Sequence, residues 1–210
     1  IYGLGNRHQR SWLAVDLGVS FGDEEHLPGI DLIMPDVSFL EKERRNLVGL
    51  VLTHAHEDHF GAIIDLWPKL QCPIYVTQFS AALFAAKLEA ERNPPKIPVT
   101  VVPSGGRIDL GPFNVEFIPV AHSIPESHAL AIHTEVGTVL HTGDWKIDPT
   151  PILGLPTDEK RLRELGEAGV LALVGDSTNA VRDGRSPSEA EVAIIIAGLV
   201  KSAKGRVAVT

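Results

Sequence analysis

The strongest signal in the sequence is Leu47-Val-Gly-Leu-Val-Leu-Thr-His54-Ala-His56-Glu-Asp58-His59. Its first part, residues 47–53, is a nearly continuous apolar run bounded by charges, which is typical of a strand buried on both faces. Directly after it, three imidazoles and a carboxylate fall within six residues. Packing explains this cluster poorly, because each polar group would need a partner or solvent in a tight turn. Imidazole nitrogen and carboxylate oxygen are ligands of Zn²⁺ and related ions, so the turn is predicted to bind metal.

The spacing of these ligands predicts two metal ions. His54 and His56 are two residues apart, so they point the same way if strand geometry continues past the apolar run. Asp58 and His59 lie beyond the bend and can face a second ion. Two more candidates follow later predicted strands, one after residues 113–120 and one after residues 138–141. The predicted assignment is His54, His56 and His122 on one ion, Asp58 and His59 on the other, and Asp144 bridging both.

A two-metal centre of this kind predicts a hydrolase. A water that bridges two ions about 3.5–4 Å apart loses a proton near neutral pH and becomes a hydroxide nucleophile. The ions also polarise a phosphoryl or carbonyl oxygen and neutralise charge in the transition state. Asp58 and Asp144 are the predicted catalytic residues, because Asp58 can take up or orient the proton of that water and Asp144 bridges the ions. The sequence contains no Ser-His-Asp set, P-loop or Gly-rich dinucleotide fingerprint that would compete with this interpretation.

Two other residues are predicted to support the ligands without binding metal. Asp16 ends the strand expected at residues 11–15, where it can accept a hydrogen bond from a ligand histidine and fix its tautomer. The alternative interpretation is a turn aspartate. His141 lies close to Asp144, one strand position inward. The remaining histidines lack a partner pattern and are expected in surface or hydrogen-bonding roles: His8, His26, His128 and His133.

The composition indicates an ordinary globular protein. The chain has 210 residues, of which 44% are hydrophobic and 22% charged. No apolar run reaches the ~18 residues that a membrane span needs, and the first residues lack the zones of a signal peptide. The single cysteine, Cys72, is expected to be buried and fits a reducing cytoplasm. The net charge of −8 is unusual for a nucleic-acid enzyme, although bound divalent cations would add local positive charge.

The hydrophobic pattern predicts a layered α/β domain, with a second unit beginning near Asp176. Strands are expected at residues 11–15, 47–53, 74–77, 99–102, 113–120, 129–134, 138–141 and 170–174, the last of them buried. Helices are expected at residues 59–67, with Pro68 as a stop signal, and at 79–92, 158–168 and 188–204. Ser188 could cap the last helix, with Glu191 three residues on. Residues 206–210 are expected to begin one more strand.

These motifs resemble a known family. The motif at residues 54–59 resembles the signature of the metallo-β-lactamase superfamily, and the flanking stretches look like ribonuclease J. The stretches are Gly29-Ile-Asp-Leu-Ile-Met-Pro-Asp36, Thr53-His-Ala-His-Glu-Asp-His-Phe-Gly-Ala62, His122-Ser-Ile-Pro-Glu126, His141-Thr-Gly-Asp-Trp-Lys-Ile-Asp148 and Gly175-Asp-Ser-Thr-Asn179. The resemblance implies an αβ/βα sandwich over residues 1–175 that binds two divalent ions, taken as Zn²⁺. It also implies that residues 176–210 begin an inserted β-CASP domain.

The same resemblance implies a function. Enzymes of this family hydrolyse RNA from the 5′ end and internally, in the bacterial cytoplasm, and commonly form homo-oligomers. Ser177 and Thr178 become candidate RNA contacts. The family's metal ligands and its first-strand aspartate map onto His54, His56, Asp58, His59, His122, Asp144 and Asp16.

The sequence departs from the family pattern on its C-terminal side. The family's further histidine ligand, its phosphate-gripping serine–histidine pair and its C-terminal assembly domain do not occur among these residues. The chain is therefore expected to bind metal but to show weak or no ribonuclease activity alone. Three alternatives stay open: a small-molecule hydrolase acting on a β-lactam, lactone or thioester, a non-catalytic metal-stabilised scaffold or RNA-binding fragment, and a transfer-RNA 3′-processing nuclease. The flanking motifs favour the ribonuclease J interpretation over the first of these.

Overall fold

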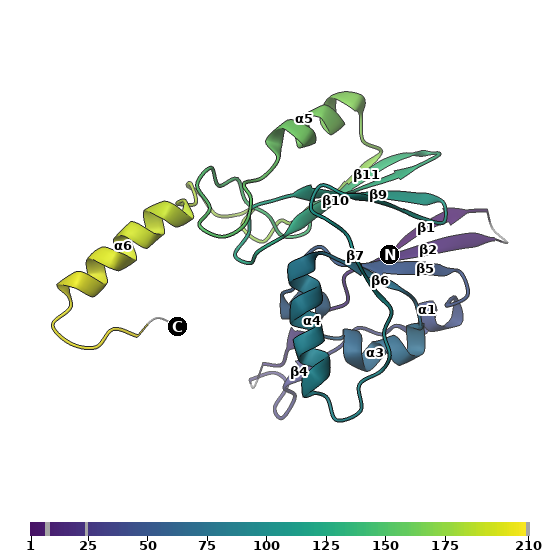
Figure 1. Cartoon of the computed structure of the whole chain (residues 1–210), viewed down its shortest axis with the longest axis horizontal. Helices are drawn as coiled ribbons and strands as arrows, with labels where there is room; N and C mark the ends of the chain where they lie inside the picture. Colours follow the sequence, from purple (N-terminus) through teal and green to yellow (C-terminus); the bar gives the residue numbers. More distant parts are fainter. Residues whose placement is uncertain (7–8, 24, 209–210) are drawn as a thin grey trace.

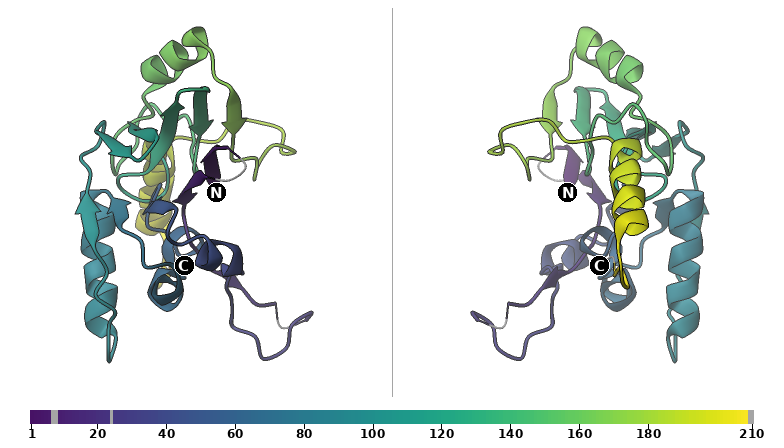
Figure 2. Two further views of the ribbon diagram at one scale, coloured as in Figure 1. Left: turned by 90° about the vertical axis from the view of Figure 1, so that its right-hand side faces the viewer. Right: turned by 90° about the vertical axis from the view of Figure 1, so that its left-hand side faces the viewer.

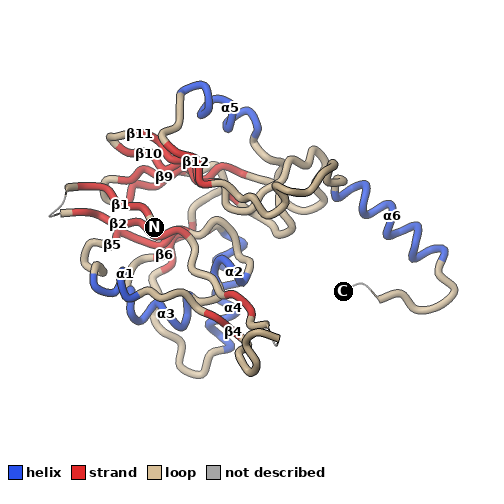
Figure 3. The backbone as a smooth tube through the Cα atoms, turned by 180° about the vertical axis from the view of Figure 1, so that it is seen from behind, coloured by secondary structure: helices blue, strands red, loops and turns tan. Residues whose placement is uncertain are grey.

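The fold consists of two five-stranded sheets packed face to face with helices outside both of them (Figure 1). The structure is a computed structural model, and it describes residues 1–6, 9–23 and 25–208. The first sheet has the order β1-β2-β5-β6-β7, and the second has the order β12-β11-β10-β9-β8. Seen from behind, the strands form two stacks with α6 standing apart from them (Figure 3). The predicted αβ/βα layering is confirmed.

The strands of the first sheet are β1 (Tyr2–Gly5), β2 (Arg10–Val15), β5 (Leu47–Val51), β6 (Ile74–Val76) and β7 (Val99–Val101). Strands β2, β5, β6 and β7 run parallel, and β1 is antiparallel to β2. The strands of the second sheet are β8 (Arg107–Leu110), β9 (Phe113–Pro119), β10 (His128–Thr134), β11 (Gly137–His141) and β12 (Ala172–Val174). Only the β11–β12 pair of this sheet is parallel. A short ribbon of β3 (Ser20–Phe21) and β4 (Leu32–Ile33) lies outside both sheets.

Three apolar clusters hold these layers together. Between the sheets, Leu13 and Val51 of the first pack against Phe117 and Leu130 of the second. The outer face of the first sheet is covered by α1 (Ser38–Lys42), α3 (Ile63–Leu70) and α4 (Gln78–Ala90), which share its core cluster. The outer face of the second sheet is covered by α5 (Glu159–Ala168), whose Leu165 is buried there. Figure 2 shows α5 and α4 on opposite sides of the strands.

The helix expected at residues 59–67 is wrong in its bounds. Two helices occur instead, α2 (Glu57–Phe60) and α3, because the backbone N–H of Ala62 donates to the carbonyl of Leu17 rather than to its own helix. Pro68 does not stop the helix but lies inside the last turn of α3. The proline removes one backbone hydrogen bond, and the helix ends soon afterwards at Gln71, whose φ of 51° is left-handed.

The strand expected at residues 170–174 occurs as β12, but the expectation that it is buried is wrong. Strand β12 is exposed along its whole length, and Leu171 and Leu173 are 64% and 63% exposed. It forms the edge of the second sheet, and α5 packs on Ile118 and Ala129 of the inner strands instead. The strand expected at residues 206–210 is absent from residues 206–208, and the last two residues lie outside the described part.

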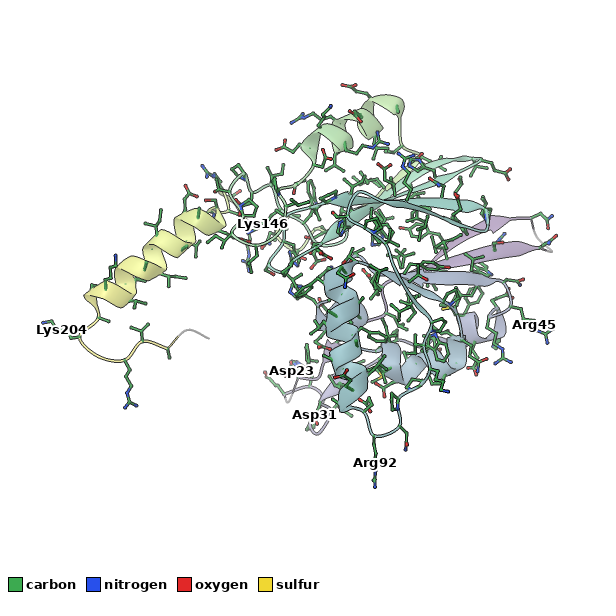
Figure 4. All side chains as sticks on the ribbon, viewed as in Figure 1. Asp23, Asp31, Arg45, Arg92, Lys146 and Lys204 are labelled. Carbon is green, nitrogen blue, oxygen red and sulfur yellow. The ribbon has the colours of Figure 1, made fainter. Side chains whose placement is uncertain are left out.

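Helix α6 (Glu189–Ser202) extends away from the sheets, and none of its residues is buried (Figure 1). The predicted capping box is confirmed, since Ser188 and Glu191 exchange hydrogen bonds at its start. Asp148 accepts a hydrogen bond from the Glu189 backbone at 2.9 Å. Lys146, labelled near the start of α6 in Figure 4, donates to the Glu189 carboxylate at 2.9 Å. The start of α6 is therefore fixed to the loop after β11, while the rest of the helix makes no such contact in the described chain. The division into domains at residue 176 stays a prediction.

Candidate metal centre

The predicted ligands meet at one edge of the two sheets. The turn with His54 and His59 follows β5, and Asp16 ends the neighbouring parallel strand β2. The second sheet contributes His122 from the loop after β9 and Asp144 from the loop after β11. Carboxyl ends of parallel strands lie at the same edge of a sheet, which is why residues so distant in sequence come together.

One group consists of His54, His56 and His122. The Nε2 atom of His54 lies 3.0 Å from Nδ1 of His56, which lies 3.1 Å from Nε2 of His122. Nitrogens that share one tetrahedral Zn²⁺ at about 2.0–2.1 Å stand roughly 3.3 Å apart, so this donor set fits a single divalent ion. The strand does not continue to these residues, since β5 ends at Val51 and the chain bends at Thr53. His56 itself has an extended backbone, with φ −75° and ψ 152°, and its ring lies beside that of His54.

A second group consists of His54, His59 and Asp144, whose candidate ligand atoms lie within 4.8 Å of one another. Oδ1 of Asp144 lies 3.3 Å from Nε2 of His59, while its Oδ2 lies 3.6 Å from Nε2 of His122. Asp144 thus presents one oxygen to each group, as a bridging ligand would. Asp58 belongs to neither compact group, although its Oδ2 lies 3.7 Å from Nε2 of His59 and its side chain is 62% exposed. The assignment of these residues to ions stays a prediction.

The electrostatics of the cluster favour unprotonated rings at His54 and His122 and a protonated ring at His59. Burial, followed by the neighbouring rings of His59, His122 and His56, lowers the pKa of His54 to about 2. Burial likewise lowers the pKa of His122, despite the nearby Asp144 carboxylate. Burial acts the same way on His59, but its hydrogen bond to Asp16 and the nearby carboxylates outweigh it and raise the pKa. A divalent ion requires unprotonated imidazoles, so His54 and His122 are ready to bind one, whereas a protonated His59 would have to release its proton.

Asp16 stabilises the turn at residues 53–59 through hydrogen bonds. Its φ of 58° is left-handed, and its carboxylate accepts three hydrogen bonds. Oδ1 accepts from the Thr53 backbone at 2.8 Å, and Oδ2 accepts from Thr53 Oγ1 at 2.7 Å and from His59 Nδ1 at 2.7 Å. His59 therefore keeps its Nε2 atom turned toward Asp144. Thr53 was not among the predicted site residues.

The loop after Asp16 stabilises the same turn through backbone hydrogen bonds. Leu17 N–H donates to the His59 carbonyl at 2.6 Å, and Val19 N–H donates to the Glu57 carbonyl at 3.0 Å. Between them, Gly18 lies so close that a Cβ there would stand 1.8 Å from the Asp58 carbonyl oxygen. Only glycine permits this approach.

Gly18→Ala is therefore expected to push the turn away from the loop. Overpacking of this kind destabilises proteins by about 1–3 kcal/mol, and the ligands would separate as well. Urea denaturation and zinc titration measure the two effects. The control is Gly166→Ala in α5, where a new Cβ meets nothing within 4 Å and helix propensity should raise stability slightly. A Gly18→Ala protein as stable and as zinc-avid as the parent would contradict this account.

The other predicted positions fall around this centre in different ways. His141 accompanies Asp16 and His59 in the lining of one cavity, but its Nδ1 pairs with the hydroxyl of Tyr2 at 2.8 Å. Its supporting role stays a prediction. His128 is buried, with hydrogen bonds to Ser104 and to the Glu126 carbonyl. His133 has the expected hydrogen-bonding role, because it contacts Thr138 and Glu116. His26 is exposed, as expected for a surface role. His8 lies outside the described residues.

Ser177 and Thr178 lie in the exposed turn after β12. They line a cavity of about 660 Å³ together with Trp145 and Arg185. This turn contacts the loop after β11 that carries Asp144, because the Asp176 N–H donates to Thr142 Oγ1 at 2.9 Å. Thr178 donates from both its backbone and its hydroxyl to the Asp176 carboxylate. Contact of Ser177 and Thr178 with RNA stays a proposal.

Comparison with known proteins gives a consistent result. The family model of the metallo-beta-lactamase superfamily matches residues 10–187. Ribonuclease J of Sinorhizobium meliloti is 53% identical over 100% of this chain and 37% of its own length. Ribonuclease J of Helicobacter pylori is 43% identical over 94% of this chain and 29% of its own length. The chain thus spans about a third of the curated relatives that it matches.

A solved structure shares the fold. The crystal structure of a protein of unknown function from Enterococcus faecalis V583 has a TM-score of 0.59 at 16% sequence identity. The match covers 95% of this chain and 53% of that one. Among the described residues, no helix combines the length and apolar character that spanning a bilayer requires.

Proposed function

This chain belongs to the metallo-β-lactamase superfamily, and on that basis we propose that it carries the metal centre of a ribonuclease that hydrolyses RNA phosphodiester bonds. The convergence of His54, His56, His59, His122 and Asp144 at one sheet edge carries the proposal. Relatives named Ribonuclease J, matched over nearly all of this chain, support RNA as the substrate. For the complete protein we propose 5′ exonucleolytic and endonucleolytic action, a cytoplasmic location and homo-oligomers.

The donor set supports two divalent ions, and its nitrogen-rich first group suits Zn²⁺. Such ions, when bound, make a coordinated water acidic near neutral pH and stabilise negative charge on a phosphoryl oxygen. His54, His56 and His122 would hold one ion, and His59 with Asp58 the other. Asp144 would bridge them, because its two oxygens already face the two groups.

The protein's own residues would then orient the reactants. Asp58 has the most exposed carboxylate of the centre, so it is accessible from solvent and suited to take up a proton during hydrolysis. Ser177, Thr178 and Trp145 line the cavity beyond Asp144 and would contact the nucleotides that extend from the scissile bond. Because the net charge is −8, attraction of the RNA backbone would depend on the bound cations and on basic surface elsewhere in a longer protein.

The experiment is a comparison of substrate classes on the purified, zinc-loaded chain. Bis(p-nitrophenyl) phosphate is a phosphodiester too small to need an RNA channel, so we expect its metal-dependent hydrolysis, abolished by chelator and by Asp144→Ala. Processing of 5′-monophosphorylated RNA should be weak by comparison, because the relatives are about three times longer. Faster turnover of nitrocefin than of the phosphodiester would favour a small-molecule hydrolase. Bound metal without hydrolysis of either substrate would favour a scaffold.

A further inference from the structure

Thr53 occupies a position that links both groups of the metal centre. Its side chain is buried, and its hydroxyl lies between the carboxylate of Asp16 and the ring of His54. The Oγ1 atom is 2.7 Å from Asp16 Oδ2 and 3.0 Å from His54 Nδ1. Asp16 Oδ2 also receives the N–H of His59 at 2.7 Å. One carboxylate therefore reaches two candidate ligands, His59 directly and His54 through the threonine hydroxyl.

The direction of these hydrogen bonds follows from proton counting. An ionised carboxylate has no proton and can only accept, so the single proton of the Thr53 hydroxyl must point to Asp16. The hydroxyl then has only lone pairs to offer His54, so Nδ1 of that ring must carry the proton. The opposite arrangement would place lone pairs of Thr53 and Asp16 against each other at 2.7 Å. His54 is thereby held as the tautomer whose unprotonated Nε2 faces His56 Nδ1 and the first group.

We propose that Thr53 is a positioning residue, which fixes the tautomer of His54 by relaying the charge of Asp16. The proposal rests on the metal centre of the proposed function. The Thr53–Asp16 pair reaches both proposed metal positions, because it contacts His54 of the first and His59 of the second. Without the hydroxyl, the ring can place its proton on Nε2, where it would block the lone pair that a metal ion needs.

Thr53→Val and Thr53→Ser form a matched pair for the test. Valine keeps the methyl group that packs near Gly143 but removes the hydroxyl, whereas serine keeps the hydroxyl and loses the methyl group. Outer-shell partners of this kind are worth about 10–100-fold in metal affinity. We expect Thr53→Val to weaken zinc binding by that factor in calorimetric titration, with Thr53→Ser within a few-fold of the parent. Unchanged affinity in Thr53→Val would overturn the proposal.

A second measurement does not depend on metal or on the variants folding. The ¹⁵N chemical shifts of His54 in the metal-free parent chain report directly which ring nitrogen carries the proton. We expect Nδ1–H in the parent chain and in Thr53→Ser, and a population of Nε2–H in Thr53→Val. Nε2–H in the parent chain would overturn the proposal, even if metal binds well. A parent chain with Nδ1–H that binds no zinc would instead contradict the proposed function while leaving the tautomer relay standing.

Discussion

His54→Ala is expected to reduce bound zinc from about two ions per chain to about one. In the proposed assignment His54 binds one ion only, because its Nε2 atom faces His56 Nδ1 while its Nδ1 atom contacts the hydroxyl of Thr53. The variant leaves that ion with two of its three histidines, His56 and His122. The other ion keeps all of its proposed ligands, His59, Asp58 and Asp144. Metal content after dialysis, measured by mass spectrometry, gives the result directly.

The matched variant is His122→Ala, which removes a ligand from the first group only. It should lose one ion and keep most of the second. His133→Ala is the control outside the centre, since His133 contacts Thr138 and Glu116 and belongs to no candidate metal group of the described residues. It should bind the parental amount of zinc. Loss of both ions in His54→Ala, with the protein folded by circular dichroism, would contradict the assignment of His54 to one ion.

The convergence of the candidate ligands could be predicted from sequence because their signal is local. Four of them fall within one six-residue turn after a buried strand, and His122 and Asp144 each follow a strand that its apolar pattern reveals. Strand ends at one sheet edge then bring the distant pair to the turn without any knowledge of side-chain contacts. The same reasoning yields the layered fold, since periodicity identifies most of the strands and helices.

What the sequence could not predict depends on contacts between distant segments. The role of Thr53 follows from a hydrogen bond to Asp16 in another strand, and the requirement for Gly18 from the close approach of two loops. The break between α2 and α3 arises because a carbonyl of Leu17 captures an N–H of the turn. The exposure of β12 shows a different limit. An apolar run indicates that a segment tends to be buried, but it does not show which other segment covers it.

The metal-free chain is expected to lose stability as the pH falls from about 6.5 toward 4, in part because of His128. Burial lowers the pKa of His128 to about 4, so the folded protein keeps this ring neutral while the unfolded chain already binds a proton. Above pH 6.5 His128 does not reduce the free energy of unfolding. Below that pH the reduction grows, and it reaches its full size near pH 4. One pKa unit corresponds to about 1.4 kcal/mol, so the loss approaches about 3 kcal/mol.

His128→Asn isolates this effect from the carboxylates that titrate in the same range. The amide cannot titrate but can still donate to the Glu126 carbonyl, the partner of Nδ1 in the parent chain. We expect the free energy of unfolding to depend less on pH in the variant, by up to about 1.4 kcal/mol per pH unit between pH 6 and 4.5. Urea denaturation at several pH values, after removal of metal, provides the comparison. Parallel curves for the two proteins would mean that His128 takes up a proton as readily in the fold as in the unfolded chain, which its burial argues against.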